Sequence, residues 1–238
     1  WQPGLVLFIA ASLQQIGIIF TSAGSAGFIT GLYVLFVPLL GLLRGQKPGY
    51  RLVLALGLAL PGLYMINSTG NIRASLGNLL VLISAVFWAI HVQLVDKYAK
   101  TNSTGELAFG QFSICAVLSG LGAVIWRISM HPETAFSFRY WQGIGTATLP
   151  ILYGGLISVG IAYTLQIKAQ KKAEPAAAAV ILCLEGVFAL FGSHLLLGEA
   201  LSVQNVSGAI LMLSAMILIS LPKKFVDRKC RSNLGVRT

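Results

Sequence analysis

The sequence predicts an all-α polytopic membrane protein, because it is strongly apolar, sparsely charged and divided into uncharged runs of helical length. Hydrophobic residues make up 56% of the 238-residue chain and charged residues only 10%. A soluble domain of this size could not bury so much apolar surface, and a disordered chain would not contain it. A transmembrane barrel would show alternating segments of about ten residues, and none appear.

Eight runs, uncharged except for Glu185 in the seventh, are long enough to be membrane-spanning helices. Each contains about 15–23 residues, which at 1.5 Å per residue approaches the ~30 Å thickness of a hydrocarbon core. The expected spans cover residues 4–20, 24–43, 52–66, 76–95, 107–126, 150–167, 175–197 and 203–221. Pro38 and Pro61 lie inside the second and third spans, where we expect each proline to bend and interrupt its helix.

The positive charges fall mainly in every second loop. Of the 17 lysines and arginines, 14 lie on one side of the expected membrane, and only Arg73, Arg127 and Arg139 lie on the other. Because basic loops face the cytoplasm, the basic side and the C-terminus are expected to be cytoplasmic. A nucleic-acid-binding protein would instead show one basic face with interleaved aromatic residues, so no nucleic-acid partner is expected.

The sequence contains no signature of an enzyme. It has no Walker motif, no H-E-x-x-H of a metalloprotease and no G-x-S-x-G frame around Ser25. The three cysteines, Cys115, Cys183 and Cys230, show neither metal-ligand spacing nor a disulfide framework. We therefore expect no enzymatic activity, no cofactor and no metal site.

An internal repeat relates the start of the chain to its end. A shift of 152 residues aligns 12–14 with 164–166 and 26–36 with 178–188, and a shift of 151 aligns 57–66 with 208–217. The first three spans thus correspond to the last three, which makes five spans the repeat unit. An odd number of spans reverses each successive unit, as in inverted-repeat transporters. Chance similarity between two leucine-rich stretches is the alternative.

The repeat predicts how the chain is divided. Residues 1–72 would hold the last three helices of a first unit, residues 73–222 a complete second unit, and residues 223–238 a basic cytoplasmic tail. The first unit is then two helices short. We therefore expect eight helices of a ten-helix inverted-repeat bundle, in a chain truncated at its N-terminus.

Three motifs resemble those of EamA-type transporters of the drug/metabolite transporter superfamily. Residues 28–34 and 37–40 (FITGLYV and VPLL) resemble the fourth helix of that family, and residues 87–91 with 95–96 (FWAIH and VD) resemble the sixth. Residues 184–189 with 195–199 (LEGVFA and LLLGE) are similar to the ninth helix, with Gly186 where the family usually has proline. The resemblance extends over nearly the whole chain.

The resemblance implies two inverted five-helix EamA repeats and a permease of amino acids, metabolites, nucleotide sugars or drugs in a bacterial inner (plasma) membrane. Together with the repeat, it predicts secondary-active export by alternating access. The expected partners are a small-molecule substrate, a coupling proton and the lipid bilayer. The sequence leaves open whether the protein forms a homodimer. A passive channel-like pore and a non-transporting structural membrane protein of the same fold are the alternative functions.

Glu185 and Tyr33 are the first candidates for substrate binding or coupling. Glu185 lies near the centre of its span, where a carboxylate costs about 2.5–3.5 kcal/mol to insert and needs a cavity or a partner. It could bind a substrate amine or carry a proton, or it could be a structural group bonded to nearby backbone. Tyr33 is its repeat mate, so an inverted repeat would place the two across an axis near the midplane. The alternative for Tyr33 is a tyrosine packed in the bundle.

Four further candidates lie within the spans. Gln14 and Gln166 are repeat mates that could line a wet path, although hydrogen bonds between helices are the commoner role of such amides. His91 could relay protons, and Trp88, one turn earlier on the same face, could stack on a substrate cation. The alternatives are a neutral, hydrogen-bonded histidine and a tryptophan packed between helices.

Overall fold

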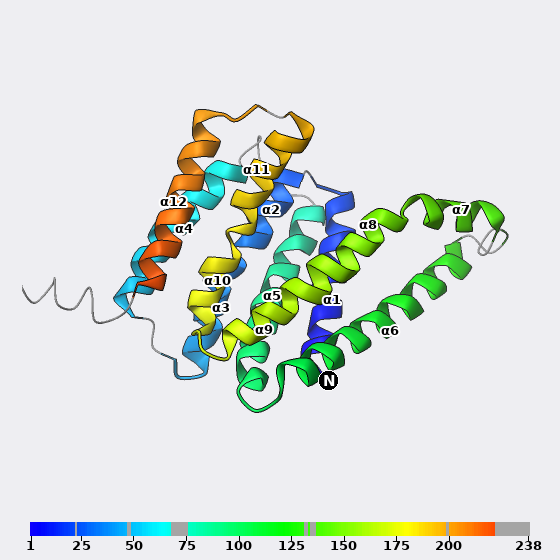
Figure 1. The fold of residues 1–238 in the computed structure, drawn as a ribbon, viewed down its shortest axis with the longest axis horizontal. Helices are drawn as coiled ribbons and strands as arrows, with labels where there is room; N and C mark the ends of the chain where they lie inside the picture. The colour runs from blue at the N-terminus through cyan, green and yellow to red at the C-terminus, as the bar shows by residue number, and fades with distance from the viewer. Residues whose placement is uncertain are drawn as a thin grey trace, which may run out of the picture.

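The described part of the chain is helical (Figure 1). The computed structural model describes residues 1–21, 23–46, 49–67, 76–130, 133, 137–198 and 200–221, and these residues contain no strand. In chain order the helices are α1 (Gln2–Ile19), α2 (Ala23–Gly31), α3 (Tyr33–Leu43), α4 (Tyr50–Asn67), α5 (Leu76–Ala99), α6 (Thr104–Met130), α7 (Phe138–Thr146), α8 (Thr148–Leu152), the π-helix η2 (Tyr153–Tyr163), α9 (Thr164–Gln170), α10 (Pro175–Leu182), α11 (Glu185–Leu197) and α12 (Val203–Ser220).

The apolar helices confirm the predicted class of an all-α polytopic membrane protein. Among the described residues, seven helical stretches are long and apolar enough to cross a membrane, and Tyr50–Ile66 is a shorter apolar helix. The seven are Gln2–Ile19, Ser25–Leu43, Leu76–Ala99, Thr104–Met130, Thr148–Gln170, Pro175–Gly192 and Val203–Ser220. Each of the eight predicted spans coincides with one of these eight stretches.

Two antiparallel helix pairs organise the bundle. α1 packs along α5, and α4 packs along α12. The direction of the second pair follows from its ends: Arg51 at the start of α4 donates to the carbonyl of Leu221 just beyond α12, at 3.0 Å. At the other end, Asn205 near the start of α12 donates to the carbonyl of Ile66 in α4, at 3.1 Å. Because α3 contacts α5 and α10 contacts both α3 and α12, these two helices join the pairs into one core.

Facing glycines let α4 and α12 approach closely. A Cβ atom on Gly208 would lie 2.7 Å from the carbonyl oxygen of Gly62, and one on Gly62 would lie 2.8 Å from the carbonyl oxygen of Gly208. The obstructing atoms are backbone, so no change of rotamer could relieve the contact. Small residues at a crossing are typical of helices that pack within lipid, where close van der Waals contact drives association.

An arm made of α6, α7, α8 and η2 extends away from the rest of the bundle (Figure 1). η2 is an 11-residue π-helix that continues α8 into α9, and the three elements together form the span Thr148–Gln170. Large exposed apolar side chains of the arm include Leu121, Ile125, Leu156 and Ile161. In a hydrocarbon solvent such side chains need no protein cover, so their exposure suits a membrane-spanning hairpin.

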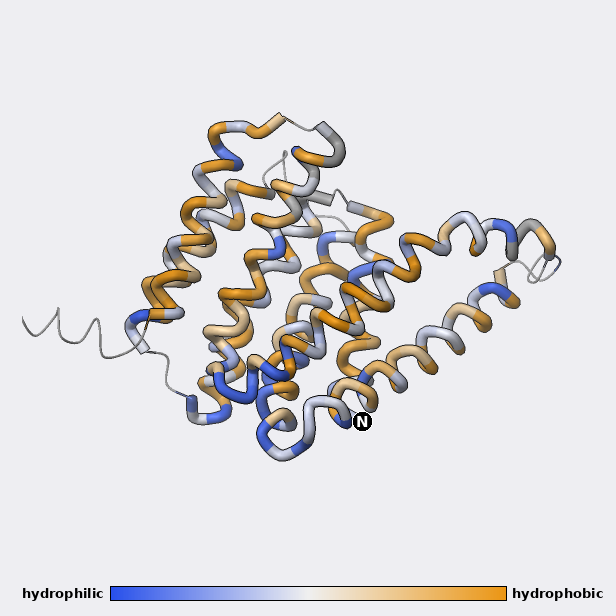
Figure 2. The backbone as a smooth tube through the Cα atoms, viewed as in Figure 1, coloured by the Kyte–Doolittle hydropathy of each residue, from blue (hydrophilic) through white to orange (hydrophobic). Residues whose placement is uncertain are grey.

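Polar residues gather at one end of the bundle, where α3, α5 and α9 end and α4, α6 and α10 begin (Figure 2). The lysines and arginines at this end, hereafter the basic end, are Arg44, Arg51, Lys97, Lys100, Lys168, Lys171 and Lys172. Arg127 lies near the opposite end of α6. Arg73 and the tail 223–238 lie outside the described residues. The assignment of the basic end to the cytoplasm stays a prediction.

The glycine crossing predicts a position-specific loss of stability. Replacing Gly208→Ala should lower the free energy of unfolding by about 1–3 kcal/mol, because the added methyl group must push two backbones apart. Thermal unfolding of the purified protein in detergent measures the change. Gly57→Ala in α4 is the matched control, since nothing lies within 4 Å of a Cβ atom there. A Gly208→Ala variant as stable as this control would contradict the assigned contact.

Candidate functional site

Two of the membrane-spanning stretches are interrupted helices. The stretch Ser25–Leu43 breaks at Leu32, between α2 and α3, and the stretch Pro175–Gly192 breaks at Cys183 and Leu184, between α10 and α11. The sequence led us to expect an interruption at Pro38, but α3 continues through Pro38 and the break lies six residues earlier. α4 likewise continues through Pro61. The proline positions therefore do not determine where these helices break.

The two breaks share three equivalent backbone hydrogen bonds. At the first, Leu32 donates to the carbonyl of Ile29, and the carbonyl of Leu32 accepts from residues 35 and 36. At the second, Leu184 donates to the carbonyl of Ile181, and the carbonyl of Leu184 accepts from residues 187 and 188. Every partner is displaced by 152 residues, which is the shift of the sequence repeat. The bonds spanning three residues tighten the helix locally, as in a 3₁₀ turn.

The breaks also touch each other inside the bundle. The thiol of Cys183 donates to the carbonyl of Gly31 at 3.7 Å, and these two residues are again 152 positions apart. Gly31 is the last residue of α2, so its carbonyl is freed by the break. The contact therefore supplies a partner to a backbone group that a continuous helix would have satisfied.

Tyr33 and Glu185 begin the second halves of the two interrupted helices. Tyr33 is the first residue of α3 and is buried, and Glu185 is the first residue of α11 and has an exposed side chain. The Cys183–Gly31 hydrogen bond joins the chain two residues before Tyr33 to the chain two residues before Glu185. The structure thus places these two sequence-predicted residues at neighbouring helix breaks. The carboxylate also lies at a helix N-terminus, where the backbone dipole favours negative charge.

Trp88 and His91 belong to an aromatic group next to this pair. The ring of Trp88 lies 5.9 Å from that of His91 and 6.2 Å from that of Tyr163, between ring centres. Tyr163 also contacts His91 at 6.3 Å and Phe112 at 6.4 Å. Residues of α5, α6 and η2 therefore form one aromatic group, and its Trp88 packs against the core that contains Tyr33, Cys183 and Leu184.

His91 is a buried, hydrogen-bonded residue. Its Nε2 lies 3.1 Å from Oε1 of Gln111, and both side chains are almost fully buried. His91 Nδ1 and Gln111 Nε2 have no hydrogen-bond partner among the described residues. The sequence analysis missed Gln111 and Tyr163. Gln111 carried the same signal as Gln14, an amide within a span, whereas Tyr163 directly precedes the repeated segment 164–166.

The repeat mates Gln14 and Gln166 have different surroundings. Gln14 donates to the hydroxyl of Thr30 at 3.2 Å and accepts from the indole N–H of Trp88 at 2.9 Å, so it links α1 to α2 and α5. Gln166 donates to Gln170 within α9, at 3.2 Å. Gln170 in turn donates to the carbonyl of Val92 in α5, also at 3.2 Å. Gln14 therefore reaches the aromatic group directly, whereas Gln166 bonds within its own helix.

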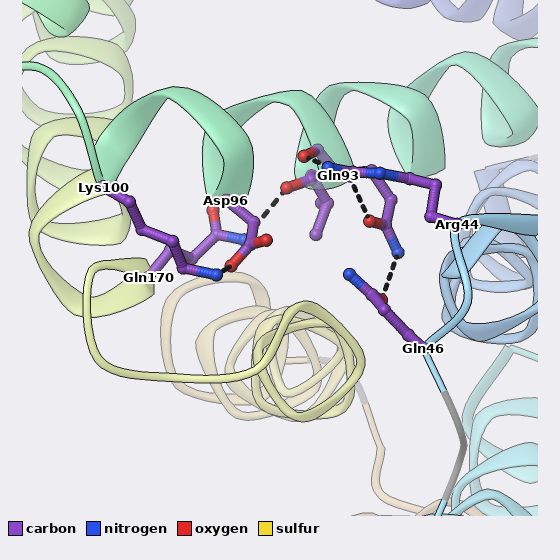
Figure 3. Close-up of polar contacts among 7 residues, drawn as sticks. Arg44, Gln46, Gln93, Asp96, Lys100 and Gln170 are labelled. Carbon is purple, nitrogen blue, oxygen red and sulfur yellow. Dashed lines mark hydrogen bonds and ion pairs between the residues drawn. The ribbon is translucent and has the colours of Figure 1, made fainter. Parts of the chain in front are cut away.

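A second polar cluster, at the basic end, was not predicted from the sequence (Figure 3). Gln93 in α5 donates to the carbonyl of Val37 in α3 at 2.8 Å. Arg44, just beyond α3, donates to the Gln93 carbonyl at 3.0 Å and to its side-chain oxygen at 2.7 Å. One turn further along α5, Asp96 pairs with Lys100 at 2.7 Å. The contacts of Gln93 with Val37 and Arg44 tie the end of α3 to α5, whereas the Asp96–Lys100 pair lies within the end of α5.

The fold and its interrupted helices define an all-α integral membrane protein with polar groups held inside the bundle. Comparison with known proteins identifies the family of this membrane protein. Residues 75–221 match the model of the EamA-like transporter family. The chain belongs to that family, which confirms the resemblance of its motifs.

Two relatives agree with this assignment, and one solved structure shares the fold. The chain is 31% identical over 219 residues to a transporter of Archaeoglobus fulgidus, covering 92% of this chain and 67% of the relative. It is 24% identical over 184 residues to the inner membrane transporter YicL of Salmonella typhimurium, covering 77% of this chain and 59% of that protein. A crystal structure 18% identical in sequence matches the fold with a TM-score of 0.74, over 92% of this chain and 75% of the other.

The contacts of Gln14 predict its contribution to stability. Replacing Gln14→Leu should lower the free energy of unfolding by about 1–3 kcal/mol, because it leaves the buried Thr30 hydroxyl and the Trp88 indole N–H without this partner. Thermal unfolding in detergent, followed by tryptophan fluorescence, measures the loss.

Gln15→Leu is the matched control, because Gln15 is adjacent and exposed. Its replacement should change stability little. Equal losses in the two variants would show that the Gln14 hydrogen bonds do not carry the effect.

Proposed function

We propose that this membrane transporter is a secondary-active permease that exports small organic solutes by alternating access around Glu185 and Tyr33. The observation that carries the proposal is the pair of interrupted helices, which break at positions 152 residues apart and meet at the Cys183–Gly31 contact. Broken helices within a membrane occur where freed backbone groups and helix ends line a substrate or ion site.

The chemistry beside the breaks supports a polar solute with an apolar part. Glu185 offers a carboxylate and Tyr33 a hydroxyl, while Trp88, Tyr163 and Phe112 offer aromatic surface. A carboxylate next to aromatic faces suits an amine, because both attract a positive charge. The same carboxylate is our proposed carrier of the coupling proton.

The helix pairing supports two inverted halves, 1–72 and 73–222, that move against each other. α4 and α12, which the 151-residue shift relates, lie antiparallel and cross at Gly62 and Gly208. Mates that pack antiparallel are what a twofold axis in the membrane plane requires. Rocking of one half against the other about such an axis would expose the central site to each side in turn.

The proposal also includes the membrane in which the protein lies and its orientation there. The name of the Salmonella relative supports a bacterial inner membrane, and the basic end supports a cytoplasmic C-terminus. Both relatives are named as transporters, which supports the expectation that the chain is not an enzyme.

Neutralising Glu185 is the direct test. In vesicles containing the purified full chain, Glu185→Gln should reduce proton-driven solute movement by about tenfold or more, since a hydrogen bond to a charged group contributes about 1.5–3 kcal/mol. A screen of amino acids, amines and drug-like cations as solutes provides the assay, and unfolding temperature verifies that the variant is folded.

Glu106→Gln is the matched control, because Glu106 is an exposed carboxylate in the first turn of α6. It should leave the rate unchanged. A folded Glu185→Gln variant with the parental rate and pH profile would refute the coupling role. Solute that only equilibrates across the vesicle, without accumulating against its gradient, would favour the passive pore, and no movement of any solute would favour the structural role.

A further inference from the structure

A pocket at the basic end lies apart from Glu185 and Tyr33. Its volume is about 360 Å³, which falls at the small end of the range for sites that hold small molecules. On α3 the pocket begins at Pro38, about one and a half turns beyond Tyr33, and it lies where α3 and α5 end and α10 begins. The residues that line it are Pro38, Gln46, Leu52, Lys100, Lys171, Lys172, Ala173, Glu174, Pro175 and Ala176.

The lining is positive. Lys100, Lys171 and Lys172 line it together with one carboxylate, Glu174, and the Asp96 carboxylate pairs with Lys100, which leaves a net charge of +1 for this group. Positive loops alone are expected at the cytoplasmic ends of membrane helices. They do not require three lysines to line one concavity, and this grouping distinguishes the pocket from the remaining basic surface.

Buried polar side chains hold the pocket walls in place (Figure 3). The Asp96 carboxylate, almost fully buried in α5, pairs with the Lys100 ammonium at 2.7 Å and so fixes one cation at the pocket. Gln170, also buried, bonds the carbonyl of Val92 at 3.2 Å and anchors the turn that carries Lys171 and Lys172. Gln46 contacts Gln93 at 3.4 Å on the opposite wall. The walls are therefore ordered before any ligand arrives, which reduces the entropy lost on binding.

The rest of the lining is apolar and compact. Pro38 and Leu52 contribute from α3 and α4, and Pro175 and Ala176 form the first turn of α10. The N-terminal end of α10 adds partial positive charge to that of the lysines. A ligand that fits this surface is small, carries one anionic group and has a short apolar part.

We propose that this pocket binds the anionic group of a small organic phosphate or carboxylate, with Lys100, Lys171 and Lys172 as its ligands. Ammonium groups on flexible stems suit an oxyanion approached from several sides, and partial exclusion of water strengthens the attraction. The anion could belong to a free solute or to the headgroup of an anionic lipid, since both present the same chemistry at this end of the bundle. The site is independent of the proposed role of Glu185.

Direct binding to the full chain tests the proposal without a transport assay. The protein is placed in nanodiscs of phosphatidylcholine and titrated with phenyl phosphate, with bound phosphate followed by phosphorus NMR. We expect saturable binding. The double variant Lys171→Gln/Lys172→Gln should weaken it about tenfold, or about 1.4 kcal/mol in total, because two partly exposed ion pairs with the anion are lost.

The matched control is Lys97→Gln/Lys168→Gln, which removes the same charge from two exposed lysines that do not line the pocket. It should change binding by less than about twofold. Equal weakening by both double variants would overturn the proposal in favour of general attraction to a basic surface. Lys100 is left intact, because its loss would leave the buried Asp96 carboxylate without its cation.

A second set of nanodiscs, with part of the lipid replaced by phosphatidylglycerol, identifies the source of the anion. Competition between phosphatidylglycerol and phenyl phosphate that disappears in Lys171→Gln/Lys172→Gln would assign the pocket to a lipid headgroup. Binding unaffected by phosphatidylglycerol would assign it to a free solute. An absence of saturable phenyl phosphate binding in phosphatidylcholine, together with an absence of bound phosphatidylglycerol that depends on Lys171 and Lys172, would refute the site.

Discussion

The pairing of backbone groups at two helix breaks is the constraint on which the arrangement of this bundle depends. In hydrocarbon an unpaired N–H or C=O group costs several kcal/mol, so a spanning helix can break only where other groups replace its lost hydrogen bonds. Here each break closes with tightened turns, at Leu32 and at Leu184, and the Cys183 thiol bonds the freed carbonyl of Gly31. The two interrupted spans therefore have to meet inside the bundle, and the other helices pack around the place where they do so.

Neutral amides connect the remaining helices. Gln14, Gln93 and Gln170 each bond a group on another helix, at 3.2, 2.8 and 3.2 Å. An amide offers both donor and acceptor and carries no charge, so it links helices in lipid at a lower desolvation cost than an ion pair. The Asp96–Lys100 ion pair lies instead near the basic end, where the Lys100 side chain is 55% exposed to solvent. The bonds between helices within the bundle thus involve neutral amides, whereas the ion pair lies near the basic end, where it is exposed to water.

The candidate site could be predicted in part, and the parts that failed have a physical cause. The repeat placed Glu185 opposite Tyr33 in the alignment, and in the structure the two helix breaks beside these residues meet through Cys183 and Gly31. Tyr163 and Gln111 were missed, because their contacts with Trp88 and His91 join segments separated by about twenty to seventy-five residues, and no spacing in the sequence records such a contact. The break at Leu32 was missed for a related reason. Pro38 frees only one carbonyl and α3 tolerates it, whereas Leu32 has no local signature and breaks where α10 and α11 offer a partner.

By itself the sequence determined the class of protein, the positions of the eight apolar spans and the end at which the basic residues collect. These are partitioning properties: each depends on how a short segment distributes between water and hydrocarbon, and the residues of that segment suffice to decide it. Only the tertiary structure decided which faces meet, where helices break and that three lysines share one pocket with a buried Asp96 behind them. Those features depend on shape and hydrogen bonding between helices far apart in the chain, and neither hydropathy nor spacing carries that information.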